Sequence, residues 1–300
     1  MQRPIRFSLS PPVPVGTERI GKYQGSLPWQ VKSWGRKNGA PLLPLLKLLG
    51  QKRINDTEKL PMRCTFVYFD AGFTLIKPNP SVGYHYAEVA RRYGIEADPG
   101  RIDAAFPDAW RTARRTAPAA PGVPYGRNIE EAITFWTVVV ENAFRGAGFE
   151  PPPRNSSYYR TIFHHFAHPE CWKLYPDVEP ALDLLDAEGL RYGVLSNFDP
   201  RIHQILEGLG LKQRLARLLT SSEIGSEKPA PALFERARQM LSGEEALRPG
   251  LIGDEPDADG FGAFEAGWKQ CLVIRKGDLP THPELRAERD LISAVKALIR

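Results

Sequence analysis

The chain has 300 residues, of which 42% are hydrophobic, 10% aromatic and 25% charged. This composition is typical of a globular protein and excludes a fibrous or wholly disordered one. No segment approaches the roughly 18 uninterrupted apolar residues of a membrane span, and the apolar run 41–50 is broken by Pro44 and Lys47. We therefore expect a cytoplasmic protein without a membrane partner, with one large domain or two modest ones.

The first 62 residues differ in charge from the rest. They hold 11 Lys or Arg against 3 Asp or Glu, a net charge of +8, whereas residues 63–300 carry −3. The segment is also rich in Pro and Gly and lacks sustained periodicity, so we predict a poorly ordered extension over 1–62. Three interpretations stay open: a basic tail that meets nucleic acid or acidic surfaces, a targeting segment, or upstream sequence that is not normally translated, with Met62 as the start. For the remaining chain we expect no nucleic-acid partner.

The cysteines Cys64, Cys171 and Cys271 form no C-x-x-C pair. Such an odd, widely spaced set argues against a disulfide framework or a zinc site. Cys64 and Cys271 lie in apolar, strand-like runs, so we expect them to pack as small hydrophobic side chains.

From Arg63 onward, short apolar runs alternate with amphipathic stretches, which indicates a parallel sheet wrapped by helices. The predicted strands are CTFVYFD (64–70), RYGVLSN (191–197), RLLTSSE (217–223), GLIGDE (250–255) and QCLVIR (270–275). A helix is predicted after the second of these strands, where apolar residues recur at helical spacing from Ile202 to Leu209. Two more helices are predicted over 231–241 and 258–267. We predict an α/β fold with a Rossmann-like parallel sheet.

Residues 81–185 have a different character, because they are helix-like and rich in Trp, Phe, Tyr and Arg. This stretch is too long for a simple crossover helix, so we predict an inserted helical cap over 81–185 and a core over 63–80 and 186–300. Some of its side chains either line a pocket for an anionic substrate or pack within the cap and face water: Trp110, Arg111, Arg114, Arg115, Trp136 and Tyr159.

Polar residues follow the predicted strands. In an open parallel sheet, ligands bind outside the carboxyl ends of the strands. Each of these residues has an ordinary alternative as a helix cap, a turn residue or a solvated charge, but their shared placement predicts that they converge on one crevice. The residues are Asp70, Ser196, Asn197, Lys228, Asp254 and Asp259.

Four segments resemble the ordered motifs of the haloacid dehalogenase superfamily of hydrolases, in the branch with a helical cap inserted after the first strand. They are FDAGFTL (69–75), VLSN (194–197), GSEKPAPALF (225–234) and IGDEPDADGFGAFEAG (252–267). The resemblance covers about residues 63–300. It implies a Rossmann-like core, a mobile cap, an aspartate nucleophile and, in the phosphatase members, Mg²⁺.

The resemblance also implies individual roles. Asp70 would be the nucleophile that forms a covalent ester, and Lys228 would be a fixed positive charge beside it. Ser196 and the backbone N–H that follows it, from Asn197, would bind phosphate oxygens. The predicted Mg²⁺ ligands are Asp70, Asp254 and the backbone carbonyl of Gly72, with Asp259 as a further ligand or an orienter of metal-bound water.

One expected acid is missing. Phosphatase members usually carry a second aspartate two residues after the nucleophile, where this chain has Gly72, and Phe73 stands where glycine is usual. General acid–base help is worth about 10²–10⁴-fold, so we expect slow hydrolysis of esters with poor leaving groups. Cap residues that could substitute are Glu130, Glu131, His164, His165 and His168.

The pair His164 and His168 lies one helical turn apart, as metal ligands on a helix often do. We expect packed side chains rather than a metal site there, because no third ligand is evident.

We predict a Mg²⁺-dependent hydrolase of a small phosphorylated molecule, with an altered acid step at Gly72. Two alternatives stay open. The first is a metal-independent dehalogenase or a phosphonate-cleaving hydrolase, since the equivalent position is not acidic in those members. The second is a catalytically weak protein that binds phosphate and has a regulatory role.

Overall fold

The computed structural model describes residues 64–116, 125–241 and 248–300. The predicted extension over 1–62, with its three interpretations, lies outside the described residues. Within the described ranges, no helix combines the length and the apolar content that a transmembrane segment needs.

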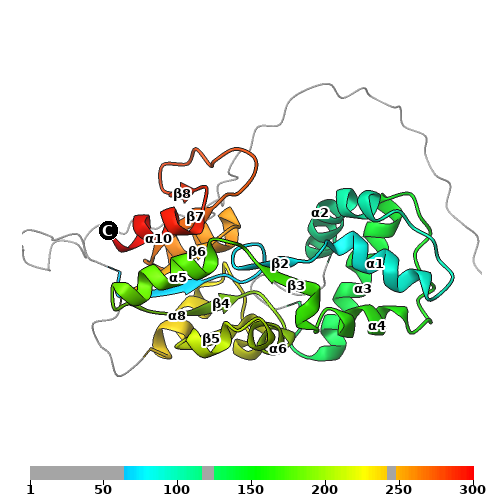
Figure 1. Cartoon of the computed structure of the whole chain (residues 1–300), viewed down its shortest axis with the longest axis horizontal. Helices are drawn as coiled ribbons and strands as arrows, with labels where there is room; N and C mark the ends of the chain where they lie inside the picture. The colour runs from blue at the N-terminus through cyan, green and yellow to red at the C-terminus, as the bar shows by residue number, and fades with distance from the viewer. Residues whose placement is uncertain (1–63, 117–124, 242–247) are drawn as a thin grey trace, which may run out of the picture. The chain divides into compact units, whose positions relative to one another are not determined.

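The described core is built on a six-stranded parallel sheet (Figure 1). Its strands, in spatial order, are β5 (Arg217–Thr220), β4 (Arg191–Ser196), β1 (Phe66–Phe69), β6 (Pro249–Gly253), β7 (Lys269–Val273) and β8 (Ala287–Glu288). The five predicted strands are confirmed, and the short edge strand β8 is an addition. Strand β1 lies in the middle of the sheet, with Phe69 opposite Val194 of β4 and Ile252 of β6.

Strand β1 is buried on both faces. Successive side chains of a strand point to opposite faces, so Val67 and Phe69 pack in one cluster while Phe66 and Tyr68 pack in another. A continuous apolar strand of this kind requires helices on both sides. The helices that contribute to the first cluster are α5 (Val178–Ala187), α6 (Arg201–Gly208) and α10 (Leu291–Ile299), and α8 (Pro231–Gln239) contributes to the second.

Short elements connect the strands to these helices. They are η3 (Lys212–Arg214), α7 (Ser221–Ile224), η4 (Pro256–Phe261) and α9 (Gly262–Glu265). The element η4 is a π-helical turn that begins three residues after β6 and carries Asp259. Such turns occur often at functional sites.

An antiparallel ribbon of β2 (Ile76–Pro78) and β3 (Trp172–Leu174) leads from the sheet to a helical insert (Figure 1). The insert consists of α1 (Val82–Arg91), α2 (Pro99–Thr116), α3 (Ile129–Gly146) and α4 (Tyr158–His165), and the single turn η2 (Pro169–Cys171) precedes β3. Its helices bury apolar side chains such as Tyr86, Ile102 and Phe144 against one another.

Helix α5 lies mostly within the range 81–185 that we predicted for the cap, but it packs with the sheet. Its side chains Leu182 and Leu185 share a buried cluster with Val67 of β1 and Leu298 of α10. Its packing therefore groups α5 with the sheet rather than with α1 to α4. The division of the chain into a cap and a core stays a prediction.

Candidate active site

Three neighbouring strands deliver polar side chains to the same edge of the sheet. Asp70, Ser196 and Asp254 stand at or directly after the carboxyl ends of β1, β4 and β6. The backbone N–H of Asp70 still donates to Ile252 O at 2.8 Å, so the ladder between β1 and β6 continues up to the site. Lys228 reaches the same place from the loop between α7 and α8. We call Asp70, Ser196, Lys228, Asp254 and Asp259 the strand-end cluster.

Lys228 is the centre of this cluster. Its side chain is 1% exposed, and its Nζ lies 2.6 Å from both Asp70 Oδ1 and Asp259 Oδ1. Burial alone would lower the pKa of Lys228, but the Asp259 and Asp70 carboxylates outweigh it and raise the pKa. The ammonium is therefore a fixed positive charge.

The side chain of Asn197 holds the main chain of Lys228 in place. Its Oδ1 accepts from the Lys228 N–H at 2.8 Å, and its Nδ2 donates to Lys228 O at 2.9 Å. We predicted a phosphate-binding role for Asn197. Because its amide is engaged in this way, its backbone N–H is the group that suits such a role.

The Asp70 carboxylate is buried and held through one oxygen. Its Oδ1 accepts from Ser196 Oγ at 3.0 Å and from Lys228 Nζ. Burial, opposed by Lys228 and reinforced by Asp259, raises the pKa of Asp70 to about 6. The ordinary pKa of an aspartate is near 4, so a further cation beside this carboxylate would favour its ionised form.

Asp254 and Asp259 complete the acidic side of the cluster. Thr74 Oγ1 donates to Asp254 Oδ1 at 2.9 Å, and Asp259 Oδ2 accepts from the backbone N–H groups of Asp254 and Glu255 at 3.1 and 3.0 Å. Asp254 keeps some solvent contact. Its pKa is nevertheless raised, first by partial burial and then by the negative charges of Asp70 and Asp259.

The donor set of the cluster fits Mg²⁺. Oxygen atoms of Asp70, Asp254 and Asp259 all lie within 4.8 Å of one another. Mg²⁺ prefers hard oxygen ligands and commonly takes one or two carboxylates. Three carboxylates face a single ammonium here, so a divalent cation would neutralise the negative excess.

The turn after Asp70 contains both departures from the motif, Gly72 and Phe73. Phe73 has φ of 58° and a side chain that is 47% exposed. This left-handed conformation is the reason why glycine suits the position. At Gly72, a Cβ would meet no atom within 4 Å. The missing second acid is therefore not excluded by lack of space.

The helical insert contacts two residues that are sequence neighbours of the strand-end cluster. Arg114 of α2 forms a bidentate pair with the buried Glu227, with Nη2 2.6 Å from Oε1, and Tyr125 Oη donates to Asn197 O at 3.1 Å. Glu227 precedes Lys228, and Asn197 follows Ser196. The sequence marked Arg114 as a pocket candidate, but nothing in it indicated Tyr125 or Glu227.

Most of the other cap residues marked in the sequence have local partners. Trp110 and Trp136 pack with Tyr125 and Phe135 in an aromatic cluster. Arg115 is exposed, Arg111 pairs with Asp108, and the Tyr159 hydroxyl donates to a backbone carbonyl, that of residue 152. These contacts give no support to a pocket lined by all six residues.

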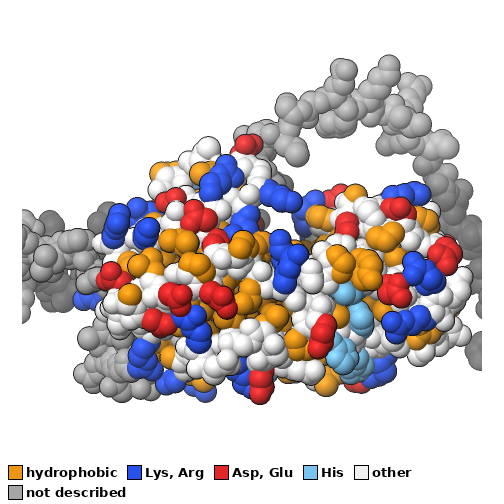
Figure 2. Space-filling model, viewed as in Figure 1, with side chains coloured by type: hydrophobic (Ala, Val, Ile, Leu, Met, Phe, Trp, Pro, Cys, Tyr) orange, Lys and Arg blue, Asp and Glu red, His pale blue; other side chains and the backbone are white. Residues whose placement is uncertain are grey.

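The proposed substitutes for the missing acid also have other surroundings. Glu130 and Glu131 form ion pairs with Arg160 and Arg127. His164 and His168 are exposed, so the expectation that they are packed was wrong. Figure 2 shows histidine side chains gathered on the surface over α4.

Two further residues of the site were missed in the sequence. Thr74 supports Asp254 across 180 residues of chain, and its only local signal was its place in the first motif. Glu255 adds a carboxylate beside Asp254. Its side chain is exposed, yet the surrounding protein, then Asp259 and Asp70, raise its pKa to about 7.

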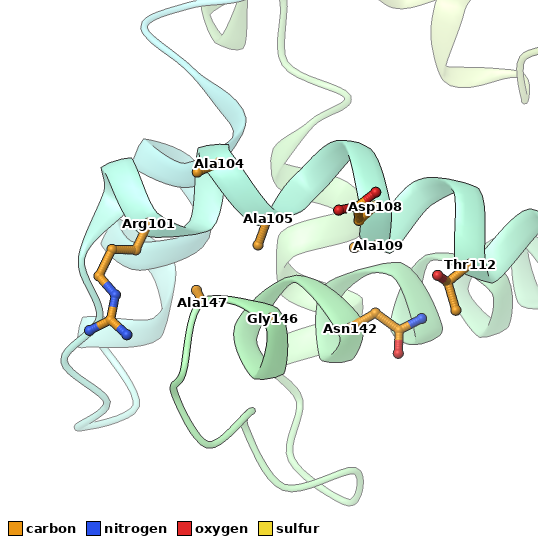
Figure 3. A pocket seen from close by; sticks show the side chains of 9 residues that line it. All are labelled: Arg101, Ala104, Ala105, Asp108, Ala109, Thr112, Asn142, Gly146 and Ala147. Atoms are coloured by element: carbon orange, nitrogen blue, oxygen red, sulfur yellow. The ribbon is translucent and has the colours of Figure 1, made fainter. Parts of the chain in front are cut away.

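A separate pocket of about 570 Å³ lies between α2 and α3 (Figure 3). Its lining combines small residues such as Ala105 and Gly146 with the polar side chains of Arg101, Asp108 and Asn142. It contains no residue of the strand-end cluster.

Comparison with known proteins identifies the family. Residues 67–267 match the family model of haloacid dehalogenase-like hydrolases. The chain belongs to this family, as its four motifs predicted, and is a hydrolase of it. The haloacid dehalogenase-like hydrolase domain-containing protein 3 of Danio rerio is 30% identical over 236 residues, which cover 78% of this chain and 94% of the relative.

Solved structures agree with the fold. A defluorinating L-2-haloacid dehalogenase matches with a TM-score of 0.60 at 18% identity, covering 78% of this chain and 95% of its own. The putative hydrolase YfnB of Bacillus subtilis, bound to magnesium, matches with a TM-score of 0.55 at 16% identity, covering 79% and 99%. At such identities the matches show the fold alone, and they confirm the predicted α/β Rossmann-like architecture.

The conformation of Phe73 generates a prediction. At ordinary positions, alanine is more stable than glycine by about 0.5–1 kcal/mol. At position 73 the order should reverse, with Phe73→Gly more stable to urea than Phe73→Ala by about 1 kcal/mol, because the left-handed backbone penalises any Cβ. An alanine variant that is the more stable of the two would contradict the assigned backbone conformation.

Proposed function

We propose that this chain is a Mg²⁺-dependent hydrolase of small-molecule phosphate esters, with Asp70 as its nucleophile. The observation that carries the proposal is the cluster of three carboxylates, with oxygens within 4.8 Å of one another, around the single buried ammonium of Lys228. Such a cluster attracts a divalent cation, and the cation and Lys228 together suit a phosphate group.

Asp70, Asp254 and the backbone carbonyl of Gly72 would hold the Mg²⁺. Asp259 is better suited to an orienting role, because its two oxygens already accept from Lys228 and from two backbone N–H groups. When bound, Mg²⁺ would neutralise charge on the oxygens of the transferring phosphoryl group.

The contacts of Asp70 indicate which of its atoms reacts. Oδ1 is engaged by both Ser196 Oγ and Lys228 Nζ. We assign Oδ2 as the atom that attacks phosphorus, forming an aspartyl phosphate while the ester oxygen departs with its electron pair. Water then attacks phosphorus and the P–O bond to Asp70 breaks, so that Asp70 and inorganic phosphate are released and the proton of the water passes to solvent. Lys228 lowers the pKa of the carboxylate and so favours its ionised form. The N–H of Asn197 would hold phosphate oxygens, together with Ser196 Oγ once its proton turns from Asp70 to the phosphate.

The departing oxygen needs a proton when its conjugate acid is weak. Gly72 offers none, so the proposed substrates are phosphates with good leaving groups, such as acyl or aryl phosphates. Such a substrate is the small phosphorylated partner that we predict. The cytoplasmic location also stays a prediction.

Gly72 also favours a second candidate, a hydrolytic dehalogenase, because a halide departs without a proton. However, 2-haloacids are anions, and the carboxylates of Asp254 and Asp259 would repel them when no metal is bound. Release of chloride from 2-chloropropionate in the presence of EDTA would favour this second candidate over the phosphate hydrolase.

The nucleophile assignment predicts a kinetic result. Wild-type protein should release nitrophenol from p-nitrophenyl phosphate with Mg²⁺ and stop with EDTA, and Asp70→Asn should reduce the rate by about 10³-fold or more, since it removes the attacking carboxylate. The matched control is Asp257→Asn, an exposed aspartate in η4, which should keep the wild-type rate. Equal rates for wild type and Asp70→Asn would remove the assignment, and a folded wild type that is inactive would favour a phosphate-binding role.

The open space at Gly72 predicts a gain of function. Because a Cβ there meets no atom within 4 Å, Gly72→Asp should fold and supply the missing proton, accelerating hydrolysis of alkyl phosphates by about 10²-fold or more. Gly72→Asn has the same size but cannot donate a carboxyl proton, so it should show no gain. A folded Gly72→Asp variant that is no faster than Gly72→Asn would overturn the missing-acid account.

A further inference from the structure

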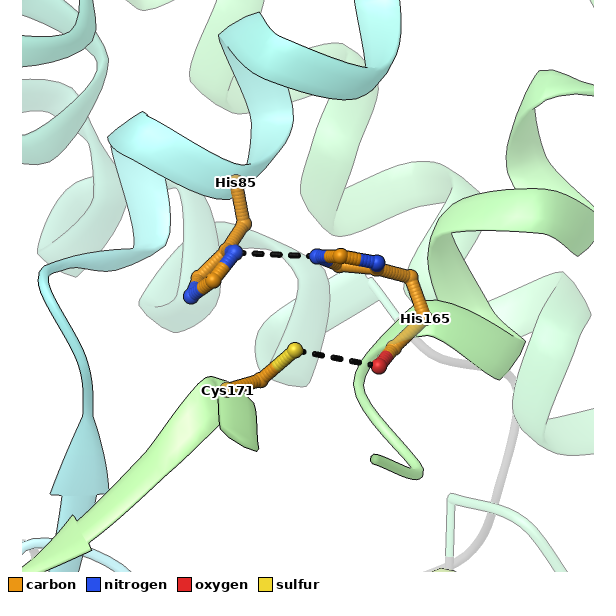
Figure 4. A group of neighbouring side chains, drawn as sticks. All are labelled: His85, His165 and Cys171. Carbon is orange, nitrogen blue, oxygen red and sulfur yellow. Dashed lines mark hydrogen bonds between the residues drawn. The ribbon is translucent and has the colours of Figure 1, made fainter. Parts of the chain in front are cut away.

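Three metal-ligating side chains meet where the helical insert joins the β2 and β3 ribbon (Figure 4). They are His85 on α1, His165 at the end of α4 and Cys171 at the end of η2. One ligand atom from each lies within 4.8 Å of the others. The group contains no residue of the strand-end cluster, and we call it the junction cluster.

The hydrogen bonds of His85 prepare one of its nitrogens to bind a metal. Its Nε2 lies 2.9 Å from Asn79 O. A carbonyl oxygen can only accept, so the neutral ring carries its proton on Nε2 and presents an unprotonated Nδ1. Metal-bound histidines commonly give their second N–H to a backbone carbonyl in this way. This Nδ1 points at His165 Nε2, 2.9 Å away.

The other two side chains face the same point. Cys171 Sγ donates to His165 O at 3.2 Å, so the thiol lies beneath the histidine pair (Figure 4). Burial lowers the pKa of both imidazoles, that of His165 to about 4, so both rings are neutral at physiological pH, as ligands must be. Cys171 is buried and would have to lose its proton to the metal.

We propose that the junction cluster is a transition-metal site that takes one Zn²⁺ or a similar divalent ion through His85 Nδ1, His165 Nε2 and Cys171 Sγ. Two imidazole nitrogens and a thiolate are the ligand types that zinc prefers. Ligand atoms in a tetrahedral zinc site stand about 3.3–3.6 Å apart. The cluster's separations, from 2.9 Å to at most 4.8 Å, bracket that range.

Binding is balanced by the movement of two protons. The Cys171 thiol releases its proton to solvent, and His165 carries its proton on Nδ1 instead of Nε2, so that each ligand atom offers a lone pair. His165 is half-buried, so its side of the cluster meets solvent, from which an ion and a fourth ligand, water, would come. Mg²⁺ would not compete, because it prefers oxygen ligands.

The site would tie together the two chain segments that connect the insert to the ribbon. His85 bonds to Asn79, directly after β2, and the Asn79 N–H donates to Cys171 O at 2.8 Å, directly before β3. A metal across His85, His165 and Cys171 would fix α1 and α4 to these segments. The bound ion should therefore raise the thermal unfolding midpoint of the whole protein.

The test uses Co²⁺ as a spectroscopic substitute for zinc, added to the full chain in a large excess of Mg²⁺ so that oxygen sites are filled. Wild type should bind one Co²⁺ with the near-ultraviolet charge-transfer band of a cobalt–thiolate bond. Cys171→Ser should lose the band, and His165→Asn should weaken binding by about tenfold or more. The matched controls, His164→Ala and His168→Ala, remove exposed neighbours and should behave as wild type.

Three outcomes of the Co²⁺ titration would contradict the site. A wild type without the band, a band that persists in Cys171→Ser, or a band that is lost in His164→Ala would each overturn the proposal. If circular dichroism shows that Cys171→Ser does not fold, His165→Asn decides, because unchanged Co²⁺ affinity in that variant rules out the site. None of these results depends on phosphatase activity.

Discussion

The buried ammonium of Lys228 between Asp70 and Asp259 is the interaction on which the rest of the site depends. An ammonium that is 1% exposed is costly to bury unless carboxylates pair with it. Its two partners follow β1 and β6, and its main chain is held by Asn197 after β4. One residue therefore couples three neighbouring strand ends, through its side chain and its main chain, and the cluster forms only when the central sheet is in register.

The carboxylates of the strand-end cluster outnumber its one ammonium, and the loop that carries this ammonium also contacts the helical insert. Asp254 is a third carboxylate, and Lys228 forms its ion pairs with Asp70 and Asp259 instead. The pKa of Asp254 is raised by burial and by the negative charges of Asp70 and Asp259. Directly before Lys228, Glu227 receives Arg114 from the insert. The insert and the ammonium of Lys228 therefore meet at the same short loop.

The sequence predicted the fold and the members of the cluster because that information is local. Asp70, Ser196 and Asp254 each stand at or directly after the end of an apolar run, and parallel strands bring such positions to one edge. Contacts between distant segments had no local signal. Thr74 with Asp254 and His85 with His165 are separated by 180 and 80 residues, and the single cysteine near two histidines matched no spacing rule. Helix α5 has the same amphipathic pattern as the helices of the insert, so only packing shows that it covers the sheet.

The central proposal is that the strand-end cluster binds one divalent cation, and calorimetric titration of Mg²⁺ into metal-free protein tests it most directly. Wild type should bind one ion per chain, and Asp254→Asn, which keeps the size of the side chain and an acceptor for Thr74, should bind roughly tenfold more weakly or worse. The exposed Asp257→Asn should bind like wild type. Wild-type affinity in Asp254→Asn, or no binding by the folded wild type, would contradict the claim.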